Sequence, residues 1–375
     1  MNQSYYHEEH KRLPELDVLK TIAVISMIFV HVLEVSSELN TSDPLSRGIA
    51  TLIEFLGCVP SAGVFMFFMG WGAAMSRKKG MKTFIDRFLQ LFLLGLLVNF
   101  FQQLVPMLLE PEVFGKAQEN LYTIIAVDIY QFASLATLYF AIMQKLNRNT
   151  KSAMIFSILL LSFCMILNAT LGCETFTTGN NWYDTLIGFF VRENEYSYFP
   201  FISWILFPIS GYGAAFLYQK LDGKKNLLSC CFVTGIGLIL LSELLMNIFS
   251  IRDVIIRHVY PAEEGYYAMH PVCGIGAIGI IVTEFALVSY VLRIRKKQLP
   301  GFFSFVDQNV MFIYVTQWIM IGLLSPVLND ITQLGVNMLF SLGVLITACI
   351  LAKCYRIIRE KLPENIQHSM SYLIK

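Results

Sequence analysis

Three polar residues, Asp17, Lys20 and His31, interrupt the otherwise apolar stretch LDVLKTIAVISMIFVHV at residues 16–32. An α-helix turns about 100° per residue, so His31 returns to within about 20° of the helix face that carries Lys20. The axial rise between these two residues is about 16 Å, roughly half of the hydrocarbon thickness of a bilayer. If this stretch spans a membrane, it therefore places an imidazole at membrane depth.

A neutral imidazole accepts a proton from a hydroxyl or amine near neutral pH, which makes His31 a candidate general base. The alternative is a structural histidine that is hydrogen-bonded between two helices. Ionisable groups in hydrocarbon cost a few kcal/mol each and are therefore candidates for function. Besides His31, the apolar segments contain Glu54, Asp128, Glu243 and Glu284.

The composition indicates that these helices lie in a membrane. Of the 375 residues, 55% are hydrophobic and only 15% are charged, whereas soluble domains carry about 25% charged residues. The mean hydropathy is +0.58. We therefore expect an all-α polytopic membrane protein in contact with the lipid bilayer, and no nucleic-acid partner.

Runs of about 17 to 25 mostly apolar residues predict ten membrane-spanning helices. Their approximate ranges are 17–35, 50–75, 88–109, 122–143, 152–171, 200–218, 227–249, 269–292, 303–325 and 334–355.

The charge of the connections alternates along the chain. Every second connection is basic, as in RKKGMK (77–82), QKLNRNTK (144–151), QKLDGKK (219–225) and RIRKK (293–297), and the intervening ones carry Glu and Asp. Because cytoplasmic loops hold the excess of Lys and Arg, both termini are predicted to be cytoplasmic. We see one membrane domain over residues 1–375, and the short outer connections favour the bacterial plasma membrane.

The eight cysteines lie mostly inside apolar segments without metal-ligand spacing, so we expect small apolar core residues and no metal. The first sixteen residues are polar, so no cleavable signal peptide is expected.

Two further groups of residues each have two interpretations. Lys20 and Arg87, which open the first and third segments, either extend toward the membrane surface or hold phosphate groups at helix starts. The outer connections are rich in aromatic residues, which form either an interfacial belt or a stacking surface for a sugar-like acceptor. These aromatic residues are Trp182, Tyr183, Tyr196, Tyr198, Tyr260, Tyr266 and Tyr267.

The segment RLPELDVLKTIAVISMIFVHV resembles the first helix of the integral-membrane acyltransferases, namely the acyltransferase 3 family and the heparan-alpha-glucosaminide N-acetyltransferase family. In the former, a basic residue and a histidine are separated by ten positions, as Lys20 and His31 are. Further similar stretches follow in order: VPSAGVFMFFMGWGAAMSRKKG, FIDRFLQLFLLGLL, VDIYQFASLATLYF and SFVDQNVMFIYVTQW.

The resemblance implies a ten-helix enzyme that takes an acyl group, acetyl in the simplest case, from cytoplasmic acyl-CoA to an acceptor on the outer side. His31 would be the base, and Lys20 and Arg87 would hold the CoA phosphates. Lys20 stands where the acyltransferase 3 family generally has arginine, Gln90 where a second arginine is usual, and Gln317 where a late histidine is common.

The expected reaction is acyl transfer to a hydroxyl or amine, such as one on a cell-surface carbohydrate. Two polar pairs, Asp128 with Gln131 and Tyr314 with Gln317, either bind this acceptor or pack between helices.

The rival interpretation is a transporter or lipid-handling protein. In that protein Glu54, Glu243, Glu284 and His31 would line a translocation path or proton relay.

Overall fold

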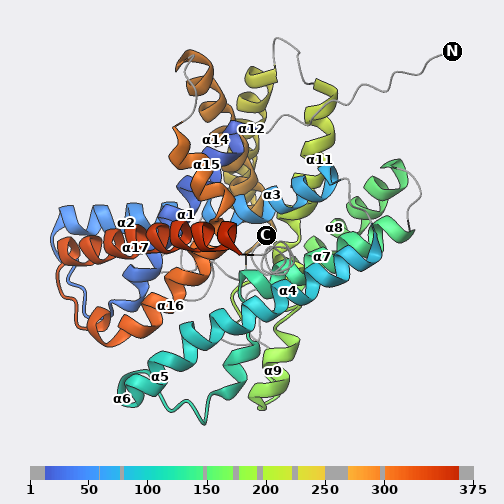
Figure 1. Ribbon diagram of the computed structural model, residues 1–375. Helices are drawn as coiled ribbons and strands as arrows, with labels where there is room; N and C mark the ends of the chain where they lie inside the picture. The colour runs from blue at the N-terminus through green and yellow to red at the C-terminus, as the bar shows by residue number, and fades with distance from the viewer. Residues whose placement is uncertain are drawn as a thin grey trace.

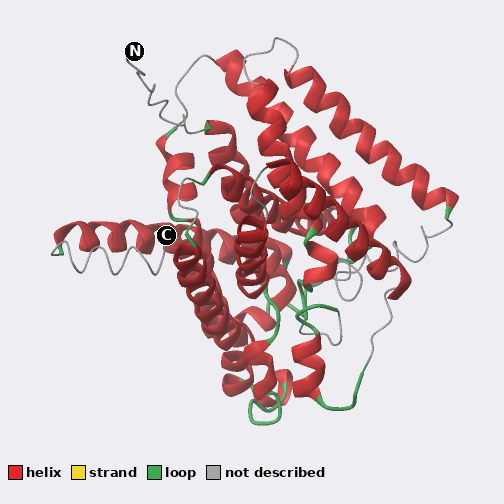
Figure 2. Cartoon of the chain, turned by 90° about the vertical axis from the view of Figure 1, so that its right-hand side faces the viewer, coloured by secondary structure: helices red, strands yellow, loops and turns green. Residues whose placement is uncertain are grey.

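The computed structural model describes nine stretches of the chain, and every regular element in them is helical (Figures 1 and 2). These stretches are residues 13–58, 60–76, 80–146, 150–171, 177–191, 197–221, 227–249, 269–295 and 300–362. Of the residues discussed above, Arg77, Lys78, Lys79, Tyr196, Tyr260, Tyr266 and Tyr267 lie outside them.

The first two predicted spans form three helices. Helix α1 covers the whole of the opening stretch with a proline in its first turn, and the second span is divided next to Pro60, whose ring cannot continue a hydrogen-bonded helix. The bounds are α1 Pro14–Val35, α2 Pro44–Cys58 and α3 Ser61–Met75.

The third span continues through a π-helical turn into a short last helix. Its parts are α4 Met81–Asn99, the π-helix η1 Phe100–Leu104 and α5 Val105–Leu109, followed by α6 Pro111–Phe114.

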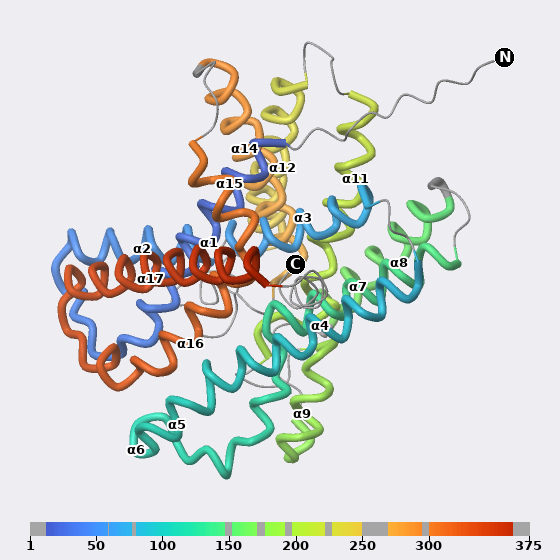
Figure 3. Tube along the Cα trace, in the orientation of Figure 1, coloured from blue at the N-terminus to red at the C-terminus, as the bar shows by residue number. Residues whose placement is uncertain are grey.

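The fourth span begins later than predicted. Residues Leu121–Ile125 form the 3₁₀ helix η2, and α7 runs over Ile129–Leu146 instead of starting at 122. The buried Asn99 side chain donates to the carbonyls of Ile124 and Ala126, at 2.9 and 2.7 Å, and this ties the irregular segment to α4. Figure 3 shows α4 and α7 side by side.

The middle of the chain contributes further long helices, of which α12 packs along α14. The bounds are α8 Thr150–Leu171, α9 Asn181–Ile187, α10 Phe201–Trp204, α11 Leu206–Leu221, α12 Leu227–Ile248 and α14 Pro271–Arg295.

The predicted ninth span is also divided. Asn309 has a non-helical backbone and separates two helices, after which one long helix completes the described chain. The bounds are α15 Gly301–Gln308, α16 Val310–Asn329 and α17 Leu334–Lys361.

Nine helical segments of the described residues are long and apolar enough to cross a membrane. The fourth predicted span, α7, is not among them, because Gln131, Gln144 and Lys145 lower the mean hydropathy of its 18 residues. Large apolar side chains are exposed along the outer faces of α8 and α12, for example Phe163 and Val233, as lipid contact requires. The prediction of an all-α polytopic membrane protein is confirmed, whereas the side on which the termini lie stays a prediction.

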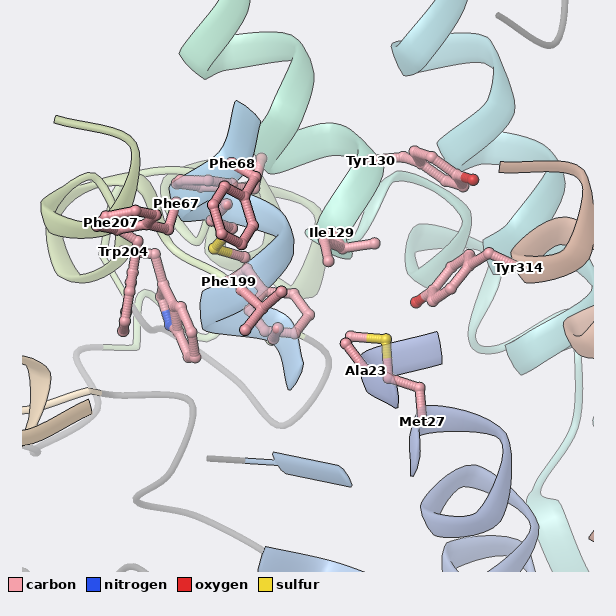
Figure 4. Close-up of a cluster of buried hydrophobic side chains, with 14 of the residues drawn as sticks. Ala23, Met27, Phe67, Phe68, Ile129, Tyr130, Phe199, Trp204, Phe207 and Tyr314 are labelled. Atoms are coloured by element: carbon pink, nitrogen blue, oxygen red, sulfur yellow. The ribbon is translucent and has the colours of Figure 1, made fainter. Parts of the chain in front are cut away.

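Two glycines allow α3 and α11 to touch backbone to backbone. A Cβ atom at Gly70 would overlap the carbonyl group of Pro208, and one at Gly211 would overlap that of Phe67. Such small residues are the usual means of close helix packing in membranes. Aromatic rings from these helices and from α10 fill the centre beside α1 and α7 (Figure 4).

Candidate active site

Helix α1 carries Lys20 and His31 at different depths, as its periodicity predicts. Val24 and Ile28 between them are buried in the core, so α1 is an inner helix rather than a peripheral one. It packs against α2, α3, α15, α16 and α17.

His31 is held by two consecutive residues of α16. Its Nδ1 lies 3.1 Å from Nε2 of Gln317. Its ring also lies against Trp318, with 4.4 Å between ring centroids and 32° between ring planes. Gln317 therefore holds the ring edge of His31 and Trp318 covers one ring face, although Gln317 lies 286 positions away in the sequence.

The Gln317 contact can be made in two ways, because an amide and an imidazole each have a donor and an acceptor side. Either the amide N–H donates to Nδ1, or the turned amide accepts from Nδ1–H. Only the second arrangement leaves Nε2 of His31 with a lone pair. The Gln317 side chain is fully buried, and its Oε1 has no hydrogen-bond partner among the described residues.

Tyr314 lies one turn before Gln317 and connects His31 to Asp128. Its ring meets that of His31 edge to face at 6.0 Å, and its hydroxyl donates to Oδ2 of Asp128 at 3.3 Å. Both Asp128 and Tyr314 are buried. Asp128, Tyr314, His31 and Gln317 therefore form a chain of contacts, the polar chain, in which Tyr314 and His31 meet through their rings and the other neighbours through hydrogen bonds.

Gln131 holds Asp128 in place. Its Oε1 accepts from the backbone N–H of Asp128 at 3.1 Å, while the Asp128 carbonyl accepts from the N–H of Phe132 at 3.0 Å. This is the N3-to-N-cap half of a capping box. The amide lies flat against Gly95 of α4, where a Cβ atom would overlap it. Gln131 thus stabilises the first turn of α7 and influences the site only by positioning Asp128.

Arg87 occupies a separate cavity on the other side of Tyr314. Its Nη1 donates to Oε1 of Gln90 at 3.0 Å, and its Nη2 lies 3.2 Å from the sulfur of Met311. Neither partner is charged. The cavity has a volume of about 170 Å³, and besides Arg87 its lining is mainly apolar, with Tyr130, Thr137 and Tyr314 as the polar side chains. A half-buried guanidinium in such surroundings has N–H groups that can bind an anionic group.

Tyr130 forms the wall between Arg87 and the polar chain. Its ring packs edge to face on that of Tyr314 at 5.3 Å, and its hydroxyl donates to the carbonyl of Met311 at 3.1 Å. Figure 4 shows the two tyrosines facing each other, with Ala23 and Met27 of α1 nearby.

Lys20 is engaged by an acidic partner. Its Nζ lies 3.0 Å from Oδ1 of Asp307, and the two side chains are 27% and 14% exposed. Lys20 contacts Asp307 before the break at Asn309, and Arg87 contacts Met311 after it. The sequence predicted phosphate contact for both residues; the structure leaves Arg87 facing a cavity and gives Lys20 a counterion.

The structure thus brings His31, Asp128, Gln131, Tyr314 and Gln317 into one connected cluster, with Arg87 adjoining it. Sequence reasoning did not single out Tyr130, Asp307, Met311 or Trp318. A signal existed for two of them: Tyr130 lies between two chosen residues in VDIYQ, and Trp318 follows Gln317 directly.

The other ionisable residues of the apolar segments do not join this cluster. Glu54 of α2 interacts electrostatically with Glu34 of α1, one turn beyond His31. Glu243 is exposed on α12, and Glu284 is half-buried on α14.

Helices α6 and α9 lie at the end of the molecule opposite the last turn of α11 (Figure 1). Trp182 and Tyr183 on α9 are 50% and 63% exposed. Tyr198, by contrast, accepts a hydrogen bond from Gln103 at 3.0 Å. The Trp182 ring meets that of Tyr122 edge to face at 6.4 Å, and both Trp182 and Tyr183 keep exposed aromatic surface at this end.

The model of the acyltransferase 3 family, described as an acyltransferase domain, matches residues 13–355 of the chain. No curated protein and no solved structure matches the chain significantly.

Proposed function

The chain belongs to the acyltransferase 3 family, and from this premise we propose that it moves an acyl group, in the simplest case acetyl, from acyl-CoA to an acceptor hydroxyl or amine. The observation that carries the proposal is the position of Tyr314. It lines the cavity that holds Arg87 and also contacts His31. Tyr314 thus lies between Arg87, which would bind the acyl donor, and His31, which would deprotonate the acceptor.

The donor would use Arg87 for a phosphate group. The cavity is smaller than the 300–1,000 Å³ of typical ligand pockets, so it accommodates only a part of an acyl-CoA. Lys20 would contribute to phosphate binding only by exchanging Asp307 for the ligand. Lys20 and Gln90 stand at positions where the family usually has arginines, which bind phosphate with two parallel hydrogen bonds. Arg87 is therefore expected to contribute most of the affinity for the CoA phosphates.

In the proposed reaction His31 takes the proton from the acceptor as its oxygen or nitrogen attacks the thioester carbonyl. A bond forms between the acceptor and the acyl carbon, and the carbon–sulfur bond breaks. CoA leaves as a thiolate and takes up the proton, so that His31 returns to its neutral form. This role requires the turned arrangement of Gln317, with Oε1 accepting from Nδ1–H, because only that arrangement leaves the lone pair on Nε2 of His31.

Asp128 and Tyr314 would orient the acceptor beside His31. Trp182 and Tyr183 support a carbohydrate acceptor, because exposed aromatic faces stack on sugar rings. We further propose that the acceptor side is the outer side of a bacterial plasma membrane, with donor binding on the cytoplasmic side, as the alternating loop charges favour.

The rival function, a transporter with a glutamate relay, has less support. Its residues lie on different helices, and Glu243 is exposed on α12. The family membership favours group transfer.

The test is donor binding by calorimetry with acetyl-CoA and the purified protein in detergent. Arg87→Gln should raise the Kd about tenfold or more, the scale of a lost hydrogen bond to a charged group. Arg293→Gln, at an exposed position on α14, removes the same charge elsewhere and should leave the Kd unchanged. Absence of acetyl-CoA binding to the unmodified protein would contradict the proposal.

A further inference from the structure

A second cavity lies away from the candidate active site, between the first turns of α15 and the C-terminal half of α17. Its volume is about 770 Å³. The apolar part of its wall includes Phe302, Phe305, Ile346 and Ile350. Phe302, Ile346 and Ile350 are 46%, 49% and 55% exposed, so the cavity is a groove open at the protein surface.

The groove has a charged end. Lys353, Arg356 and Glu360 line it on successive turns of α17. Nε of Arg356 donates to Oε1 of Glu360 at 3.0 Å, so the three side chains together carry one net positive charge. The polar end coincides with the last turns of α17, which also contain Arg359 and Lys361.

The length of the groove matches one leaflet. From Leu345 to Glu360 the helix rises about 22 Å, since each residue contributes about 1.5 Å. One leaflet contributes about 15 Å of hydrocarbon, and the remaining length falls in the headgroup region. A membrane-spanning α17 whose first turn lies at one boundary of the hydrocarbon would therefore place the apolar wall at acyl-chain depth and Lys353 and Arg356 at phosphate depth.

We propose that this groove binds one anionic glycerophospholipid, with an acyl chain along Ile346 and Ile350 and the phosphate at Lys353 and Arg356. Basic pockets between membrane helices are suited to anionic lipid headgroups. The charge complementarity favours this lipid over a zwitterionic one, and the depth profile favours a lipid over a free phosphate.

The groove is separate from the proposed donor cavity. Helix α15, which forms one wall of the groove, also carries Asp307, the partner of Lys20. Lipid binding therefore does not depend on acyl transfer, and the two are tested separately.

The test is lipid binding to the purified full chain in detergent, measured by native mass spectrometry with phosphatidylglycerol and phosphatidylcholine. The unmodified protein should retain one phosphatidylglycerol in preference to phosphatidylcholine. The double variant Lys353→Gln, Arg356→Gln should lose most of this preference, by about fivefold for each charge. Arg293→Gln should retain it.

A second pair of variants tests the position of the acyl chain. Ile350→Trp places a large ring in the groove and should abolish retention of the lipid. Leu351→Trp adds the same ring to the neighbouring exposed position, which does not line the groove, and should retain the lipid. Each variant is compared by its thermal unfolding, so that a folding defect is recognised.

Four results would overturn the proposal. One is equal retention of both lipids by the unmodified protein. Another is equal behaviour of Ile350→Trp and Leu351→Trp. The third is displacement of the bound lipid by inorganic phosphate or CoA. The fourth is a dimer that Ile350→Trp dissociates. Either of the last two would assign the groove to another occupant.

Discussion

Gln317 of α16 and His31 of α1 are joined by a 3.1 Å contact between the amide Nε2 and the imidazole Nδ1. If His31 is the general base through Nε2, the role of Gln317 is to accept from Nδ1–H and so fix the tautomer. Gln317→Glu keeps an acceptor and should retain turnover within about tenfold. Gln317→Leu removes the acceptor and should lower turnover further. Acyl transfer measured on both variants checks this order.

The opposite order would contradict this role for Gln317. Trp318 is the matched position, since it also touches the His31 ring but by packing. Trp318→Phe keeps the packing and should change turnover less than Gln317→Leu does.

The hydrogen bond from Tyr314 to Asp128 should couple the two residues. Tyr314→Phe removes the donor and leaves a buried carboxylate, which costs about 1–3 kcal/mol. In a double-mutant cycle, Asp128→Asn and Tyr314→Phe should therefore be non-additive in the free energy of unfolding. Denaturation in detergent measures the four proteins.

Tyr130→Phe serves as the control for that cycle. Its hydroxyl donates to a backbone carbonyl instead of to Asp128. The expected pattern is weaker coupling of Asp128→Asn with Tyr130→Phe than with Tyr314→Phe. Equal coupling for both tyrosines would show that the Asp128 contact is not specific.

The close contact between α3 and α11 predicts a sharp difference between neighbouring glycines. Gly70→Ala and Gly211→Ala insert a Cβ atom into the backbone of the facing helix and should lower the midpoint of thermal unfolding or prevent folding. Gly72→Ala and Gly213→Ala meet no atom within 4 Å and should be neutral or stabilising, because alanine favours helix. Similar effects for the two pairs would contradict the observed packing.

The sidedness is tested by labelling single cysteines in a background without the native cysteines. Lys82 and Asn181 are exposed positions, the first at the start of α4 and the second at the start of α9. The loop charges predict that Lys82→Cys is protected from an impermeant thiol reagent in intact cells and that Asn181→Cys reacts. The reverse labelling pattern would invert the membrane orientation and the sidedness of the reaction.

Features that depend on local periodicity were predictable from the sequence. Lys20 and His31 share an apolar helix whose spacing fixes their relation, and α1 forms as expected. The start of α7 was predicted wrongly, because the segment before it is held in 3₁₀ form by Asn99 of α4. The side chain of a distant helix decided that boundary.

Partners far apart in the chain were beyond prediction. Asp128 and Tyr314 are separated by 186 positions, and Lys20 meets Asp307 across most of the sequence. From the sequence, Lys20, Asp128 and Tyr314 were singled out as polar residues in or beside apolar segments, but Asp307 was not. Their pairing depends on how α1, α7, α15 and α16 pack, which periodicity does not encode.

His31 is expected to accept a proton during acyl transfer. The most direct measurement is the release of CoA thiol from acetyl-CoA in the presence of an isolated cell-surface glycan fraction, with the unmodified protein, His31→Gln and His31→Ala. Both variants should bind acetyl-CoA normally, while turnover falls about a hundredfold or more, the scale of losing a positioned base. Glutamine keeps hydrogen bonding but cannot take the proton, so a fully active His31→Gln protein would contradict the claim.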